Sequence, residues 1–162
     1  ERRDKLTNTE KLKILPIIEN VLKVPTHNRL IVSKNITINL DGIDKKSTVF
    51  AEKLLLEQAL GNVLKNALDF SPKDGTITIK ASESNTATRI VVLDEGPGIP
   101  PHVSSKLFTR FFSVARPDTG RRGTGLGLRF VRKIMQLHGG EITLKNRLLQ
   151  NGAEAKLRFP LG

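Results

Sequence analysis

Two spacings of apolar residues along the first half of the chain predict its first elements. Residues 12–24 place apolar side chains three and four positions apart, which predicts a helix with Pro16 in its first turn and an end near residues 27–28. Residues 30–40 alternate apolar and polar positions in their second half, which predicts a strand. Residues 51–70 return to helical spacing and predict a long helix, which the Ser, Pro, Asp and Gly residues after it would end.

The second half of the chain predicts four strands, one helix and a long glycine-rich segment. The segment 95–125 is rich in Gly, Pro and basic residues around one short helical stretch near 104–112, and loops of this length in compact domains are usually functional lids or disordered. The order helix, strand, helix, two strands, lid, helix, two strands contains no repeat and predicts an α+β fold, a sheet layered against helices. The expected strands are 76–82, 89–94, 141–146 and 153–159, and the expected helix is 126–137, before His138-Gly139-Gly140.

Composition is that of a globular domain. The chain has 162 residues, 38% of them apolar and 27% charged, which suits one domain with a hydrophobic core. It contains no apolar run of roughly 18 residues, so no segment is expected to span a membrane. Cysteine is absent, which excludes disulfides and thiolate metal sites. The chain begins at Glu1 without a leader, and we expect it to be a fragment of a longer protein.

The net charge of +11 attracts anionic partners without choosing among them. A nucleic-acid module would be expected to combine basic residues with aromatic stacking side chains. Here aromatic residues make up only 4% of the chain, and all are Phe. We therefore expect no nucleic-acid partner.

Residues 120–128, GRRGTGLGL, carry the ingredients of a phosphate loop without matching a familiar one. No Gly-Lys pair occurs, as a Walker loop requires, and Leu128 stands where a dinucleotide fingerprint needs its third glycine. Gly123, Gly125 and Gly127 nevertheless expose backbone N–H groups and lead into a helix N-terminus, which suits a triphosphate. A flexible hinge or a simple helix start is the alternative.

Three other stretches place polar or aromatic residues where a ligand could use them. Asp94 leaves an apolar strand just before Gly96 and Gly98, although it could simply cap a turn. Asn62 and Asn66 lie four apart and share a face of an otherwise apolar helix, where Asn is unfavourable by propensity. Phe108, Phe111 and Phe112 surround Arg110, and this cluster could also be an ordinary hydrophobic anchor for a loop.

Taken in order, these stretches resemble the N, G1, F and G2 boxes of the Bergerat ATP-binding fold of sensor histidine kinases, gyrase, Hsp90 and MutL. The resemblance runs from about Lys53 to Pro160 and is strongest to the catalytic domain of two-component sensor histidine kinases. The wording of LEQALGNVLKNALDFSP, LDEGPGIP and RFFSVARP is most similar to CreC-type sensors. It implies a two-layer α/β sandwich in which a mixed, mostly antiparallel sheet packs against about three helices.

The resemblance implies a role for each box in binding ATP and Mg²⁺. Asp94 would accept the adenine amino group, Asn66 would hold Mg²⁺ through its side-chain oxygen, and Asn62 would face the phosphates. Phe70 would lie along the adenine. Asn62, Asn66 and Arg110 are the expected catalytic residues. The remaining expected nucleotide contacts are Gly96, Gly98 and Ile99 in the pocket floor and Phe111, Arg121, Arg122, Gly123, Thr124, Gly125, Leu126, Gly127 and Leu128 in or beside an ATP lid at about 100–124.

Departures from the family pattern leave alternatives open. Asp69 stands where many relatives have a basic residue that contacts phosphate, and Lys65 or Lys73 are candidates to replace it. Ser113 stands where many relatives have an arginine. ATP-hydrolysing clamps of the gyrase, Hsp90 and MutL type use a Glu as general base at the position of Asn62, so transfer to an external nucleophile is favoured over hydrolysis. A degenerate ATP sensor or an anti-sigma-like serine kinase shares the same boxes.

The resemblance also implies partners outside this chain. A sensor kinase needs a phosphoacceptor histidine followed by an acidic residue on a dimerising hairpin, and none of the three histidines has that context; His138 is expected at a helix end and the others in loops. Residues 1–11 would be a linker or the tail of that hairpin, and 12–162 the catalytic domain. The expected partners are the protein's own dimerisation and phosphoacceptor domain and the receiver domain of a response regulator. The parent protein is expected to be a homodimer anchored in the bacterial inner membrane, with this domain a soluble cytoplasmic monomer.

Overall fold

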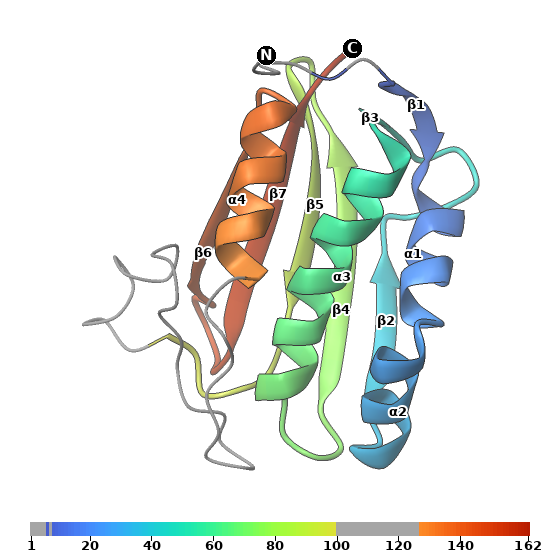
Figure 1. Ribbon diagram of the computed structural model, residues 1–162. Coiled ribbons are helices and arrows are strands. Elements are labelled where there is room, and N and C mark those ends of the chain that lie inside the picture. The colour runs from blue at the N-terminus through green and yellow to red at the C-terminus, as the bar shows by residue number, and fades with distance from the viewer. Residues whose placement is uncertain (1–5, 7, 100–126) are drawn as a thin grey trace.

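The chain folds into a sheet layered against helices. The structure, a computed structural model, describes residues 6, 8–99 and 127–162 (Figure 1). The strands are β1 (Glu10–Lys13), β2 (Thr37–Asp41), β3 (Thr48–Ala51), β4 (Thr76–Glu83), β5 (Ala87–Leu93), β6 (Glu141–Asn146) and β7 (Ala153–Pro160). The helices are α1 (Ile14–Leu22), α2 (Pro25–Ser33), α3 (Lys53–Phe70) and α4 (Gly127–Leu137).

Within the described residues, the main sheet has five strands in the order β2-β4-β5-β7-β6. β2 runs parallel to β4, and the other neighbouring pairs are antiparallel. Along β4 and β7 buried and more exposed residues alternate, as expected for a sheet with one covered face. A separate antiparallel pair joins β1 to β3.

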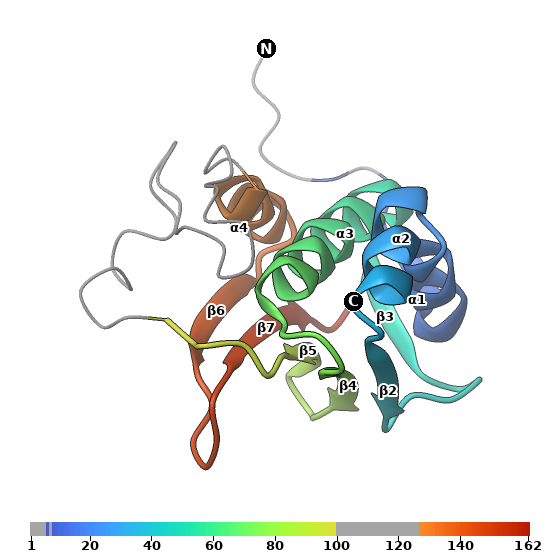
Figure 2. The same cartoon turned by 90° about the horizontal axis from the view of Figure 1, so that it is seen from below.

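All four described helices cover the same face of the main sheet, as the view along the layers shows (Figure 2). α3 lies between α4 on one side and α1 and α2 on the other, so three of its sides are covered. The predicted two-layer α+β fold with a mixed, mostly antiparallel sheet is confirmed, with four helices in the described residues where about three were predicted.

The N-terminal third differs from the sequence-based prediction. The helix predicted from residue 12 begins only at Ile14, because residues 10–13 pair with β3, a strand that the sequence did not predict. This pairing also takes Ala51 out of the predicted long helix. Glu10 and Lys11 take part in β1, the first element among the described residues; the division of the chain at residue 12 stays a prediction.

Residues 30–33 belong to α2, although a strand was predicted for them. Pro25 at the first position of α2 starts the helix without losing a hydrogen bond. Asn35, with φ of 54°, then turns the chain into β2. The sequence prediction was wrong here because α2 is polar on most of its surface and its short apolar run, LIV, favours a strand by composition.

Two histidines hold helices together. His27 was predicted in a loop, but it lies buried in α2, where its Nδ1 donates to the carbonyl of Val21 at 2.7 Å. His138 follows the end of α4 as predicted. Its Nδ1 donates to the Ile134 carbonyl at 2.9 Å while Nε2 accepts the Glu52 N–H at 3.1 Å, so both bonds need the neutral ring.

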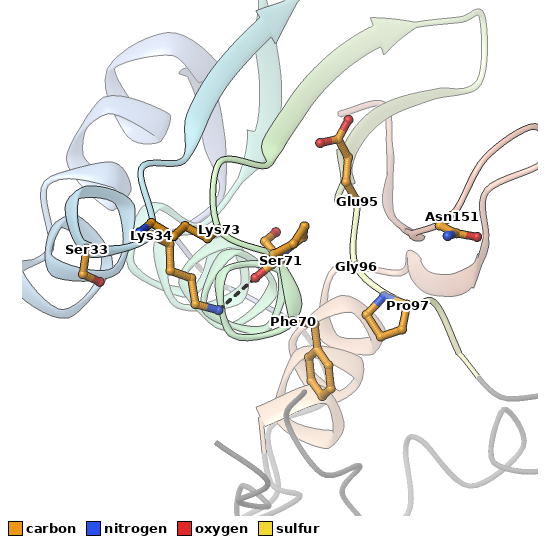
Figure 3. A pocket seen from close by; sticks show the side chains of 10 residues that line it. Ser33, Lys34, Phe70, Ser71, Lys73, Glu95, Gly96, Pro97 and Asn151 are labelled. Atoms are coloured by element: carbon orange, nitrogen blue, oxygen red, sulfur yellow. Dashed lines mark hydrogen bonds between the residues drawn. The ribbon is translucent and has the colours of Figure 1, made fainter. Parts of the chain in front are cut away.

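Lys34 caps the C-terminal end of α3. Its ammonium group donates to the carbonyls of Leu68 at 2.8 Å, Asp69 at 3.0 Å and Ser71 at 3.0 Å, and Figure 3 shows the side chain reaching this helix end. Carbonyls in the last turn of a helix lack partners within the helix, and a cation there also complements the helix dipole. Lys34 therefore fixes the backbone around Phe70.

Replacing Lys34 by Met is expected to lower the free energy of unfolding by about 2 kcal/mol, because hydrogen bonds to a charged group are lost while the aliphatic stem is kept. Urea denaturation followed by circular dichroism measures the change. Lys45→Met, at an exposed position in the loop between β2 and β3, is the matched control and should change stability little. Equal unfolding free energies for the two variants would show that the cap contributes nothing.

Candidate functional site

The carboxylate of Asp94 is fixed by the sheet itself. Asp94 follows the last residue of β5 and is 6% exposed. Its backbone N–H donates to Ala153 O at 3.1 Å, but the return bond from the Ala153 N–H goes to Asp94 Oδ1, also at 3.1 Å. The side chain thus takes the place of a backbone carbonyl in the ladder between β5 and β7, and its position is as rigid as the sheet.

The two oxygens of Asp94 have different surroundings. Oδ1 also accepts the Gly96 N–H at 2.9 Å, so it accepts two backbone hydrogen bonds. Oδ2 accepts no hydrogen bond from any residue in the described ranges. Oδ2 is thus free to accept a hydrogen bond from a donor outside the described residues, in a residue that is itself largely buried. Asp94 can therefore offer Oδ2 to a ligand while Oδ1 stays bonded to the backbone of Gly96 and Ala153.

Burial raises the pKa of the Asp94 carboxyl above its ordinary value of 3.8, although the amides of Gly96 and Ala153 and the charge of Arg147 oppose the shift. Desolvation disfavours the charged form, whereas hydrogen bonds and a nearby cation favour it. A buried carboxyl with a perturbed pKa at the end of a strand is a candidate binding residue.

The turn after Asp94 packs directly on the end of α3. A Cβ at Gly96 would collide with the carbonyl oxygen of Phe70, so only glycine allows this approach. Gly98 has φ of +84°, a conformation that glycine adopts without strain. The structure thus brings Phe70, Asp94 and Gly96 together, while the pocket floor of Gly96, Gly98 and Ile99 stays a prediction.

Asn62 and Asn66 are partly exposed residues of α3. Asn62 Nδ2 donates to the Gln58 carbonyl at 2.8 Å, and a Cβ at Gly127 would lie 3.0 Å from Asn62 Oδ1. Asn62 therefore faces the N-terminal end of α4, where a helix favours an anion. Leu128, in contrast, packs against the hydrophobic core.

The side chain of Asn66 makes no hydrogen bond with a described residue, so its oxygen is available to a ligand. Among the residues that the structure describes, no cluster of three His, Cys, Asp or Glu could hold a metal ion. Mg²⁺ does not need such a cluster, because it usually keeps waters and binds one or two protein oxygens together with substrate phosphates. The residues present fit a magnesium ion brought in with a nucleotide.

Asp69 is buried and pairs with Lys65. The Lys65 ammonium lies 3.0 Å from Asp69 Oδ2 and 3.3 Å from Oδ1. The ammonium group of Lys65 therefore opposes the negative charge of Asp69 on α3. Many relatives have a basic residue at the position of Asp69. Lys65, one residue before Asn66, remains a candidate to supply that positive charge.

A solvent-open cavity of about 530 Å³ lies beside these residues, at the ends of α2 and α3 (Figure 3). Phe70 and Gly96 belong to its lining, but Asp94, Asn62 and Asn66 do not. The cavity therefore adjoins the arrangement built on Asp94 without containing it. Its other lining residues are Ser33, Lys34, Ser71, Pro72, Lys73, Glu95, Pro97 and Asn151.

Sequence reasoning missed the residues of the β6–β7 hairpin that bind the segment 94–99. Ala153 bonds to Asp94 as described, Arg147 Nη1 donates to the Asp94 carbonyl at 2.9 Å, and Asn146 bonds to Ile99. Their sequence, KNRLLQNGA, is typical of an ordinary hairpin turn and carries no signal for a site.

Part of the predicted site lies outside the described residues. This holds for the short helix predicted near 104–112, for His102 and Ser113, and for the lid at about 100–124. The predicted site residues concerned are Arg110, Phe111, Arg121, Arg122, Gly123, Thr124, Gly125 and Leu126.

In the described part of the chain no helix is long and apolar enough to cross a membrane.

Comparisons with known proteins agree with this fold. The family model described as histidine kinase-, DNA gyrase B-, and HSP90-like ATPase matches residues 51–162. The sensor protein CreC of Escherichia coli (strain K12) is 42% identical over 129 residues, which cover 80% of this chain and 26% of CreC. The catalytic domain of histidine kinase ThkA superimposes with a TM-score of 0.80 at 28% identity, covering 95% of this chain and 98% of that domain.

A second ThkA structure, the kinase in complex with response regulator protein TrrA, matches with a TM-score of 0.76 at 27% identity over 95% of this chain and 42% of that one. The chain spans only 26%, 17% and 37% of the length of three sensor kinases that it matches. The match to the family model covers more than half of the chain, and the resemblance to CreC-type sensors is confirmed. The chain therefore belongs to the histidine kinase-, DNA gyrase B- and HSP90-like ATPase family, as a catalytic domain of the sensor histidine kinase type.

Proposed function

We propose that the chain binds Mg·ATP and transfers its γ-phosphate to a histidine on a dimerisation domain outside residues 1–162. The observation that carries the proposal is the divided role of Asp94. Oδ1 is held by two backbone amides, and Oδ2 accepts no hydrogen bond in the described part of the chain. A fixed, partly desolvated carboxylate oxygen suits the amino group of adenine, since hydrogen bonds to charged groups are the stronger class.

Asn62 and Asn66 would then meet the triphosphate. Asn66 would hold Mg²⁺ through its oxygen, and the ion would neutralise phosphate charge. Asn62 faces the N-terminal end of α4, so phosphate oxygens there would meet both an amide side chain and the positive end of a helix. Lys65, held by Asp69, would add a cation at the same side of α3. The chain contributes positioning and charge neutralisation, which dominate phosphoryl transfer.

Transfer is favoured over hydrolysis because the described residues offer no general base where the clamp ATPases have one. Asn62 occupies that position, and an amide cannot take a proton from water at neutral pH. The accepting histidine would come from the dimerisation domain, and an aspartate of a response regulator would receive the phosphoryl group next. A ThkA structure in complex with a response regulator supports such a partner. We further propose that Arg110, Arg121 and Arg122, in the lid at about 100–124, supply cations to the γ-phosphate and that the parent protein is a membrane-anchored homodimer.

The proposal is tested by mixing the chain with a separately produced histidine hairpin from the same protein and Mg·ATP labelled in the γ-phosphate. We expect an acid-labile, base-stable phosphohistidine to form on the hairpin. A hairpin with its acceptor His replaced by Gln is the matched control and should stay unlabelled. Rapid release of phosphate without labelled hairpin would instead support a hydrolysing clamp, and labelled serine on a partner would support a serine kinase.

A further inference from the structure

The side chain of Asn146, the last residue of β6, binds both backbone groups of Ile99. Its Oδ1 accepts the Ile99 N–H at 2.6 Å, and its Nδ2 donates to the Ile99 carbonyl at 2.9 Å. Two such reciprocal bonds are what a neighbouring strand would supply in an antiparallel pair. A Cβ at Gly98 would lie 2.6 Å from Asn146 Oδ1, so the close approach of the two segments depends on that glycine.

The segment 94–99 is therefore held at both of its ends by the hairpin of β6 and β7. At the first end, Ala153 and Arg147 bind the carboxylate and the carbonyl of Asp94. At the second end, Asn146 alone among the described residues binds the backbone of Ile99. Figure 2 shows this segment, in yellow, leaving β5 and passing along the ends of β7 and β6.

We propose that Asn146 is a positioning residue of the nucleotide site, which acts through Ile99 and does not touch the nucleotide. This inference rests on the proposed function. Ile99 is a predicted part of the pocket floor, next to Gly98 and five residues after Asp94. Asn146 holds this floor at a fixed distance from the Asp94 carboxylate, so the base meets a preformed pocket instead of one that it must order.

The energetic consequence follows from where Asn146 lies. It is exposed at the end of an edge strand, so removing its amide leaves no cavity in the core and costs the fold little. The segment 94–99, in contrast, loses both bonds at one end and samples other positions. Part of the binding free energy must then order the segment. The apparent affinity falls in proportion to the fraction of molecules in which the segment is already in place.

The experiment compares the unmodified chain with Asn146→Ala and Asn146→Asp. Calorimetry with Mg²⁺ and a non-hydrolysable ATP analogue gives the affinity, and amide hydrogen exchange by NMR gives the protection of the Ile99 N–H. We expect Asn146→Ala to bind about tenfold more weakly, the equivalent of two ordinary hydrogen bonds, and to lose protection at Ile99. Amides of Ile142 and Leu157 in β6 and β7 should keep theirs.

Asn146→Asp separates this role from side-chain size. The aspartate keeps an acceptor for the Ile99 N–H but turns a second acceptor toward the Ile99 carbonyl, so it should weaken binding as the alanine does. Asn39→Ala, at an exposed position in β2 on the opposite edge of the sheet, is the matched control and should leave affinity unchanged.

The outcomes distinguish this inference from the proposed function. No binding by the unmodified chain overturns both. Binding by the unmodified chain with equal affinity in either Asn146 variant overturns only the role of Asn146. Weaker binding with unchanged protection of Ile99 overturns it as well, because Asn146 would then act by another route.

Discussion

Replacing Asp94 by Asn is expected to weaken binding of Mg·ATP by about 100-fold, the upper range for one charge-assisted hydrogen bond. The fold should meanwhile remain at least as stable. Oδ1 of Asp94 accepts the N–H groups of Gly96 and Ala153. In the variant the amide oxygen must stay there, because an NH₂ group would face two donors. The NH₂ group then occupies the position of Oδ2 and meets the amino group of adenine donor to donor.

The stability of this variant follows from the pKa of Asp94. Burial raises that pKa above 3.8, so the folded chain binds the proton more tightly than the unfolded chain. The free energy of unfolding therefore falls as pH rises from about 3.8 through the raised folded pKa, and at neutral pH the full cost of ionisation is present. Asp94→Asn has no carboxyl to ionise, so its free energy of unfolding should not fall over this pH range. Urea denaturation at several pH values measures the difference.

Calorimetry with a non-hydrolysable ATP analogue measures the affinity, with Asp41→Asn at the exposed edge strand β2 as the matched control. The same geometry predicts that Asp94→Asn discriminates less against inosine triphosphate, whose base carries an acceptor oxygen in place of the amino group. Unchanged affinity for the ATP analogue would remove Asp94 from adenine recognition.

The elements that the sequence predicted well are those whose pattern and packing agree. α3, α4, β4 and β5 carry apolar residues at the spacing of the face that they bury, and their predicted bounds lie within a few residues of the observed ones. β1 and β3 are short strands that exist through their pairing with each other, and α2 is held by His27 and its neighbours in α1. Such elements form because of contacts between different segments of the chain. A local sequence pattern carries no information about those contacts.

The residues of the candidate site also fall into those that the sequence singled out and those that it did not. Asp94, Gly96 and the two asparagines of α3 were predicted because their residue types are unusual for a strand end or an apolar helix. Asn146, Arg147 and Lys34 were not, because a polar residue in a loop or turn needs no special reason. Their importance comes from which backbone groups they reach, and that distance is a property of the fold.

Replacing Asn66 by Ala is expected to lower phosphoryl transfer to the histidine hairpin by about a thousandfold, roughly 4 kcal/mol of transition-state stabilisation and the order expected for a lost metal contact. The free energy of unfolding should not decrease. The Asn66 side chain makes no hydrogen bond with the described part of the chain, and Ala favours a helix interior over Asn. Transfer is measured at increasing Mg²⁺ concentration, with unfolding followed separately.

Two further variants decide whether the loss comes from the metal. Asn66→Asp keeps an oxygen that Mg²⁺ accepts, so it should retain more activity than Asn66→Ala and recover further as Mg²⁺ is raised. Asn20→Ala makes the same change at an exposed position of α1 and should have full activity. Equal losses in Asn66→Ala and Asn66→Asp, independent of Mg²⁺, would mean that Asn66 binds no metal. An asparagine kept in a helix at a cost in propensity would then need another reason, and a direct contact of Asn66 with phosphate, as proposed for Asn62, would be tested next.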